Sequence, residues 1–296
     1  MSLWFIKNYR MKYTPKELHE NVNVSHTSPV RELFLLLGGL LGILIVMYVV
    51  LGFAVDLVVM RMPPNIEQHF GSLFSGMFAE NDRTEADDCV QQLLDALVEQ
   101  SSLPGRYVVH IIPSSQANAL ALPGGHIVVL SGLLNKLKSE NELSFILAHE
   151  LGHFAARDHL KGFGRGLVLT TISAFWAGVD NSLTQFLMRS LMSVEMRFSQ
   201  RQETAADLYG LDLLKKRYGH IGGATAFFQV LATEEAHGRL AYFFATHPYP
   251  QDRVDELRRT IEAKGYPSGE KTALDPRITT IPESSESKSF KDILGF

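Results

Sequence analysis

Residues 33–55 contain no charged side chain, and this apolar run lies between Arg31-Glu32 and Asp56. A helix over these residues would be about 35 Å long, which is enough to cross a hydrocarbon core of about 30 Å. The run shows no polar stripe of the kind that marks a core helix, and it is longer than the apolar part of a secretory signal peptide. The pattern therefore predicts a transmembrane anchor over residues 33–55, in contact with the lipid bilayer.

The charges on either side of this run predict its orientation. Positively charged residues precede it, namely Lys7, Arg10, Lys12, Lys16 and Arg31, whereas the segment after Arg61 becomes acidic at residues 80–88. Positive flanks remain in the cytoplasm, so residues 1–32 are expected to form a cytoplasmic N-terminal segment. In a bacterium, this arrangement describes a single-pass inner-membrane protein with a periplasmic domain.

Beyond the anchor, the pattern becomes that of a domain with both strands and helices. Apolar positions at helical spacing predict a helix near residues 84–100, within a helical linker assigned to residues 56–105. Two β-branched segments bounded by turn residues then predict strands at 107–112 and 126–130. A small sheet is therefore expected to precede the remaining helices.

The rest of the chain is predicted to be mainly helical. Ser139 and Glu142 match a capping box that opens a helix with an apolar face. Helical spacing recurs at about residues 200–217, 222–236 and 250–264. The tail, residues 266–296, lacks a periodic apolar face and is expected to be loosely ordered. We therefore expect an α+β fold, in which one transmembrane helix precedes a mainly helical domain over residues 106–265 with a small β-sheet.

Composition and charge narrow the classes of partner. The formal net charge of -4 and a pI near 6.3 provide no basic surface for a nucleic acid, so no nucleic-acid partner is expected. The single cysteine, Cys89, excludes an intramolecular disulfide framework and a cysteine-rich metal site. The oligomeric state stays open.

The helix after Ser139 carries the sequence His149-Glu150-Leu151-Gly152-His153. A spacing of four residues places both imidazoles on one face, as a tetrahedral metal ion requires. Glu150 directly follows the first of these histidines and could act as general base toward a bound water. The pattern alone arises by chance in roughly a few per cent of such chains, so its helical context is needed to indicate a zinc peptidase.

A later helical segment offers a third ligand. A carboxylate from Glu203 would complete a His2Glu site for one zinc ion per chain. Asp207 lies one turn further along the same face, where it could accept the free ring N–H of a ligand histidine. The alternative for both residues is a solvated helix face, which is the commoner position of acidic side chains. The nearby His-Glu-x-x-His helix favours the ligand interpretation.

With two further segments, these motifs resemble the membrane-associated zinc metallopeptidase family of the HtpX, CAAX prenyl protease and BepA type. The matching segments are residues 118–125, 149–153, 203–207 and 246–248. The resemblance extends over about residues 106–264. It implies a zincin-type metalloprotease domain with zinc bound by His149, His153 and Glu203, with Glu150 as general base, and with polypeptides as substrates.

The first of these segments also suggests how a substrate could bind. An extended edge through residues 126–130 could pair with a substrate backbone as an added strand and hold the scissile carbonyl near the metal. The candidate substrate-binding residues are Gly125, His126, Ile127, Val128 and Val129. The alternative is an ordinary hairpin turn.

His247 and Arg253 are further candidates, because the resemblance implies that this region lies close to the metal. Three roles are open for His247: donating to the oxyanion, occupying the open coordination position in a resting state, or capping a helix. Arg253 is a candidate for the oxyanion position or the cleft.

Residues 164–196 are inserted between the second and third metal ligands. Their apolar runs are interrupted at Asp180 and Arg189, so each half would reach at most about 24 Å as a helix. Neither half spans a bilayer comfortably. We expect an amphipathic helical hairpin that forms part of the core or a lid, with contact to the membrane as the alternative.

The leading hypothesis is a membrane-anchored zinc endopeptidase that cleaves unfolded or misassembled envelope proteins. One alternative is a non-proteolytic holdase or adaptor with a structural metal site, and another is a cytoplasm-facing protease that acts on membrane proteins. Glu150 argues against the holdase, because a structural site needs no base. The flanking charges argue against the cytoplasm-facing protease.

Overall fold

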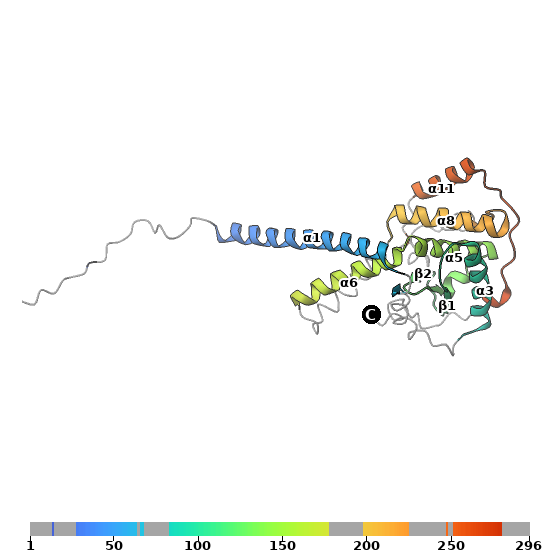
Figure 1. The fold of residues 1–296 in the computed structure, drawn as a ribbon, viewed down its shortest axis with the longest axis horizontal. Helices are drawn as coiled ribbons and strands as arrows, with labels where there is room; N and C mark the ends of the chain where they lie inside the picture. Colours follow the sequence, from blue (N-terminus) through green and yellow to red (C-terminus); the bar gives the residue numbers. More distant parts are fainter. Residues whose placement is uncertain are drawn as a thin grey trace, which may run out of the picture. The chain divides into compact units, whose positions relative to one another are not determined.

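The computed structural model describes residues 14, 28–63, 66–67, 83–177, 198–224, 247 and 251–279. Most of the hairpin expected at 164–196 and of the helix expected at 222–236 therefore lies outside the described residues. The chain forms two compact units, Met1–Met47 and Tyr48–Phe296. Its elements are α1 (Pro29–Arg61), α3 (Glu85–Gln100), β1 (Val108–Ile112), β2 (Ala119–Leu122), β3 (His126–Leu130), α4 (Ser131–Leu134), α5 (Glu140–Ala155), α6 (Asp158–Ala177), α8 (Gln200–Tyr218), α11 (Gln251–Lys264) and α12 (Pro276–Thr279) (Figure 1).

Helix α1 contains the predicted anchor and extends beyond residues 33–55 at both ends. Its most apolar window has a mean hydropathy of 2.8, and none of that window is buried. Long apolar side chains such as Phe34 and Phe53 are largely exposed. The helix is therefore long and apolar enough to cross a membrane, as the sequence predicts.

The three strands form one sheet in the order β1-β3-β2. β1 pairs with β3 in parallel, with Val108 opposite His126, and β2 pairs with β3 in the antiparallel sense, with Leu122 opposite His126. The expectation that residues 126–130 form a sheet edge is therefore wrong, because the backbone of β3 is paired on both sides. The second edge strand, β2, was not predicted as a strand.

The two outer edges of the sheet differ. On β1, the N–H groups of Val109 and Ile111 donate to Gln91 Oε1 at 2.9 Å and to Asp87 Oδ1 at 3.0 Å, so side chains of α3 close that edge. On β2, the ladder register directs the N–H and C=O groups of Ala121 away from β3. The residues of β2 are nevertheless buried.

Helix α8 lies between α5 and α11 and contacts both of them (Figure 1). The hydroxyl of Ser139 caps α5 by accepting the N–H of Glu142 at 3.2 Å. The carboxylate of Glu142 accepts the N–H of Lys138 at 2.7 Å and not that of Ser139, so the predicted capping box is only half formed. Helix α8 has a complete box, formed by Ser199 and Gln202.

The first part of the tail is ordered by its contacts, and the expectation of a loose tail is wrong for residues 266–279. The backbone of Thr272 donates to Asn141 Oδ1 at 2.7 Å and accepts the N–H of Glu140 at 2.9 Å, so this segment binds the first turn of α5. Ile278 is buried in the core next to α3. This segment is anchored by single apolar side chains that follow no helical or strand spacing, so the sequence pattern did not predict its ordered position. Residues 280–296 lie outside the described part of the chain.

Candidate metal centre and active site

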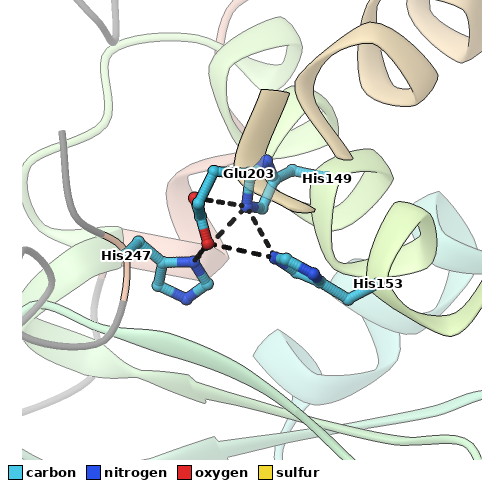
Figure 2. Close-up of side chains that lie close together, drawn as sticks. All are labelled: His149, His153, Glu203 and His247. Atoms are coloured by element: carbon cyan, nitrogen blue, oxygen red, sulfur yellow. Dashed lines mark hydrogen bonds and ion pairs between the residues drawn. The ribbon is translucent and has the colours of Figure 1, made fainter. Parts of the chain in front are cut away.

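Helices α5 and α8 bring the three predicted metal ligands together. The Nε2 atoms of His149 and His153 are 3.2 Å apart. Glu203 Oε1 lies 3.5 Å from His153 Nε2, and Glu203 Oε2 lies 3.6 Å from His149 Nε2 (Figure 2). All three residues are buried. The predicted convergence of these side chains is therefore confirmed.

A second carboxylate fixes the tautomer of each histidine. His149 Nδ1 donates to Asp207 Oδ1 at 2.9 Å, as the sequence predicts, and His153 Nδ1 donates to Asp158 Oδ2 at 3.3 Å. Because each Nδ1 atom carries the ring proton, each Nε2 atom is left as the metal-binding nitrogen. Two lone pairs only 3.2 Å apart would repel each other unless a cation or a proton lies between them.

The spacing of these donors fits zinc. Zinc–nitrogen bonds of about 2.0–2.1 Å in a tetrahedral site place the donor atoms about 3.3 Å apart. The observed separations between the histidine nitrogens and the Glu203 oxygens lie at 3.2 to 3.6 Å. Two imidazoles and one carboxylate are also the donor set of a catalytic zinc site. His149, His153 and Glu203 are therefore the residues that can hold one zinc ion.

The two ligand histidines differ in their pKa values, and together they leave room for one positive charge between them. Burial lowers the pKa of His149, so its ring is neutral and able to bind a metal ion. Burial also opposes charge on His153, but hydrogen bonds to Asp158 and Glu203 outweigh it and raise the pKa of His153 to about 9. Without a metal, the Nε2 atom of His153 thus holds a proton where a cation would otherwise bind.

Glu150 has an environment that a structural carboxylate would not have. Its side chain is fully buried, and neither oxygen accepts a hydrogen bond from any residue that the structure describes. The ring atom His247 Nε2 lies 3.7 Å from Glu150 Oε1, so the carboxylate faces the metal cluster. A buried carboxylate without hydrogen bonds is costly, which points to a functional role.

His247 joins the same cluster from a position shortly before α11. Its Nδ1 atom lies 3.0 Å from Glu203 Oε1 and 3.4 Å from His149 Nε2 (Figure 2). One donor atom from each of the four residues His149, His153, Glu203 and His247 lies within 4.8 Å of the others. The ring is thus turned into the metal cluster, which does not fit the helix-cap interpretation.

Arg253 reaches the site from α11, but its contacts differ from those expected of an oxyanion residue. Its Nη1 atom lies 2.6 Å from Glu203 Oε2, while Nε and Nη2 donate to Asp207 at 2.5 and 2.7 Å. All three guanidinium nitrogens therefore face carboxylates. In this arrangement, Arg253 fixes the positions of Glu203 and Asp207.

Sequence reasoning missed Asp158 and the residues that hold it. Asp158 begins α6 immediately after Arg157, which has a positive φ of 55°. Gln202 Nε2 and Lys161 Nζ donate to Asp158 Oδ1 at 2.8 and 3.2 Å. An acidic residue five positions after His153 is a signal in the sequence, but a first-turn aspartate is also common at helix starts for its interaction with the helix dipole.

The structure places the candidate substrate-binding residues in the sheet. Gly125 lies in the turn before β3 with a φ of 83°, and His126 contacts His110 of β1 through ring nitrogens 2.9 Å apart. The three that follow, Ile127, Val128 and Val129, are buried in β3. Because β3 has no free edge, these residues cannot bind a substrate by strand addition through their own backbone.

A His-Glu-x-x-His helix, a glutamate from a second helix and a small adjoining sheet are together the features of the zincin class of metallopeptidases. Comparison with protein families gives a match to Peptidase family M48 over residues 84–261. The chain belongs to this family. M48 metalloproteases use zinc, which is the ion that the donor set fits.

Comparison with individual proteins also gives metalloproteases. The metalloprotease LoiP of Escherichia coli is 34% identical over 168 residues, which cover 55% of this chain and 65% of LoiP. The mitochondrial metalloendopeptidase OMA1 of Homo sapiens is 31% identical over 194 residues, covering 58% of this chain and 36% of OMA1. The "Putative beta-barrel assembly-enhancing protease" of Vibrio cholerae is 24% identical over 217 residues, which cover 67% of this chain and 44% of that protein. The chain thus spans less than two thirds of each of these relatives.

Proposed function

We propose that this protein is a membrane-anchored zinc endopeptidase that hydrolyses peptide bonds of unfolded or misassembled envelope proteins. One observation carries the proposal: a buried Glu150 carboxylate without hydrogen bonds from the described residues faces a ligand set that fits zinc. All three relatives are named as proteases, which supports polypeptide substrates, and the β-barrel assembly in the name of the Vibrio cholerae protein supports substrates in the bacterial envelope.

Each residue of the site has a defined task in this reaction. A zinc ion at the cluster would polarise the scissile carbonyl and lower the pKa of the attacking water. A carboxylate oxygen of Glu150 accepts the proton of that water and passes it to the leaving amine. Asp207 and Asp158 keep the ligand rings in the orientation and tautomer that metal binding requires.

For His247, the geometry favours the resting-state role. Its Nδ1 atom lies as close to Glu203 Oε1 and His149 Nε2 as the ligand atoms lie to one another, which supports a ring that occupies the open coordination position. His247→Ala should then raise the cleavage of an unfolded substrate. A fall by about 100- to 1000-fold would instead assign His247 to the oxyanion.

For substrate binding, we propose the edge of β2 in place of β3. The backbone of Ala121 points away from β3, and α3 closes the opposite edge of the sheet. An extended substrate chain could pair there irrespective of its sequence. Because β2 is buried in the structure, such pairing requires a neighbouring part of the chain to move aside.

For localisation, we propose a single-pass bacterial inner-membrane protein with a cytoplasmic N-terminus and a periplasmic protease domain. Helix α1 and the positive charges before residue 33 support this topology. Alkaline phosphatase fused after Phe296 should be active. An inactive phosphatase together with a bright cytoplasmic fluorescent fusion would reverse the orientation.

The activity is tested on the purified full chain with unfolded casein as the substrate. Glu150→Gln should retain one zinc ion per chain and lose cleavage, because the ligands stay and only proton transfer is removed. Glu140→Gln, on the same helix but away from the metal cluster, serves as the control and should cleave normally. Wild-type turnover by Glu150→Gln would refute the mechanism. Zinc binding and suppressed aggregation without any cleavage would favour the holdase alternative.

A further inference from the structure

Helix α6 and the residue just before it contact the end of α1. Arg157 Nη1, just before α6, donates to the carbonyls of Val59 at 2.8 Å and Met62 at 2.6 Å. A methyl group on Gly164 would lie only 2.6 Å from Val55 Cγ1, so the α6 backbone closely approaches α1 at this point. Residue numbers on α6 rise as those on α1 fall. The two helices are therefore antiparallel where they meet.

On both helices, the charged residues stop at the same point of the contact, and an uncharged run begins there. Asp56 is the first charged residue after the uncharged run 33–55, and Arg165 is the last charged residue before the uncharged run 166–179. Arg165 Nη2 and Asp56 Oδ2 form an ion pair at 2.6 Å. Because α6 runs antiparallel to the end of α1, its residues after Arg165 continue on the same side of this pair as residues 48–55 of α1, and α6 extends about 18 Å further to its end at Ala177.

The surface of this part of α6 is apolar and partly open. Leu167 is 52% exposed, and Val168, Leu169 and Ile172 are partly exposed. The exposed Thr171 donates its hydroxyl to the Leu167 carbonyl at 2.8 Å, which satisfies this donor without water. Figure 1 shows α6 projecting away from the sheet and from α5 and α8. An apolar helix that leaves the catalytic domain in this way needs an apolar environment.

We propose that residues 166–172 of α6 enter the membrane beside the end of α1 and contact lipid acyl chains in the leaflet next to the protease domain. This inference rests on the proposed membrane anchoring of α1. The lipid surface of the anchor continues onto α6, and the Arg165–Asp56 pair marks the boundary between hydrocarbon and head groups.

This placement sets the distance between the active site and the membrane surface. Asp158, which holds the metal ligand His153, lies seven residues before Arg165, or about 10 Å along α6. The metal cluster is thereby held close to the membrane surface. Polypeptide segments that emerge from the membrane, or lie on it, are then the substrates that reach it most readily.

Spin-label accessibility in reconstituted vesicles tests the proposal, and the single cysteine makes the labelling simple. In the full chain with Cys89→Ser, one nitroxide is attached at Leu167→Cys or at Thr171→Cys. Ile45→Cys, exposed on the anchor, and Glu262→Cys, exposed on α11, provide the lipid and water references. The vesicles contain phosphatidylcholine and phosphatidylglycerol, and the probes are molecular oxygen and a water-soluble nickel chelate.

We expect the labels on Leu167 and Thr171 to match the label on Ile45, with strong oxygen collision and little nickel collision. Nickel access like that at Glu262 would overturn the proposal. Protection from both probes would also overturn it, because protein and not lipid would then cover the helix. If the Ile45 label itself meets nickel, the anchoring proposal fails and this inference fails with it. An Ile45 label in lipid with α6 labels in water removes this inference alone.

Discussion

Gly152 lies where α5 passes α8, between the two histidine ligands. A Cβ atom at this position would lie 2.8 Å from the Cα atom of Ala206 and 3.0 Å from its carbonyl oxygen. Both neighbours are backbone atoms, so no side-chain rotation can relieve the contact. Carbon atoms pack at about 3.5–4.0 Å. Gly152→Ala therefore requires the two helices to separate locally by roughly 0.7 Å or more.

The separation would act directly on the metal site. Glu203 precedes Ala206 on α8 by less than one turn, so its carboxylate moves away from His149 and His153 together with the helix. Overpacking of this kind costs about 1–3 kcal/mol in the free energy of unfolding, whereas replacing a helical glycine with alanine returns about 1 kcal/mol. The net change in stability should thus be small. The zinc affinity should fall much more, by about 10- to 100-fold, which is the effect of disturbing the residues that orient a ligand.

Two measurements on the same variant separate these effects. Competition with a chelator gives the zinc dissociation constant, and thermal unfolding of the metal-free protein gives the stability. Gly210→Ala is the matched control on α8, because its Cβ atom would meet the Phe145 ring at 3.1 Å and a backbone atom, His149 N, only at 3.4 Å, whereas Gly152→Ala would meet backbone at 2.8 Å. If Gly152→Ala binds zinc as tightly as the wild type and as Gly210→Ala, the close approach of α5 and α8 does not position Glu203.

Two further substitutions test other contacts. Asp158→Asn should weaken zinc binding by about 10- to 100-fold, because a neutral amide orients the His153 ring less firmly than a carboxylate, and an unchanged affinity in calorimetric titration would contradict this role. Ile278→Ala should lower the free energy of unfolding by about 2–5 kcal/mol, since this side chain is only 3% exposed and belongs to the core; urea denaturation measures the loss, and a change near zero would show that the tail segment does not stabilise the domain.

Local chemistry explains which elements could be predicted from sequence. The helix expected near residues 84–100 is observed as α3, and the one expected at 200–217 as α8, because both were predicted from helical spacing within the segment itself. In the structure, a side-chain cap also begins each of them. The His-Glu-x-x-His spacing likewise places two ligands on one face without any knowledge of the fold. These features need only a few neighbouring residues.

Pairing between distant segments was harder to infer. The β-branched residues of β3 are typical of an edge strand and of a central strand alike, and only the pairing with β1 and β2 shows that it is central. In the structure, β3 is buried almost continuously, as is typical of a strand that is covered on both faces. The bound position of residues 266–279 depends in the same way on partners in α3 and α5.

Charge balance links the residues that were predicted with those that were missed. Four buried carboxylates surround the two ligand histidines: Glu150, Asp158, Glu203 and Asp207. Arg253 and Lys161 supply two positive charges, by pairing with Glu203 and Asp207 and with Asp158. Two negative charges then remain, which one divalent cation would neutralise. Without the metal, the raised pKa of His153 supplies part of this charge as a proton. Glu203 and Asp207, four positions apart on one buried helix face, require a buried positive charge nearby. Arg253 supplies it from a position 46 residues beyond Asp207, and only the fold shows that the two residues meet.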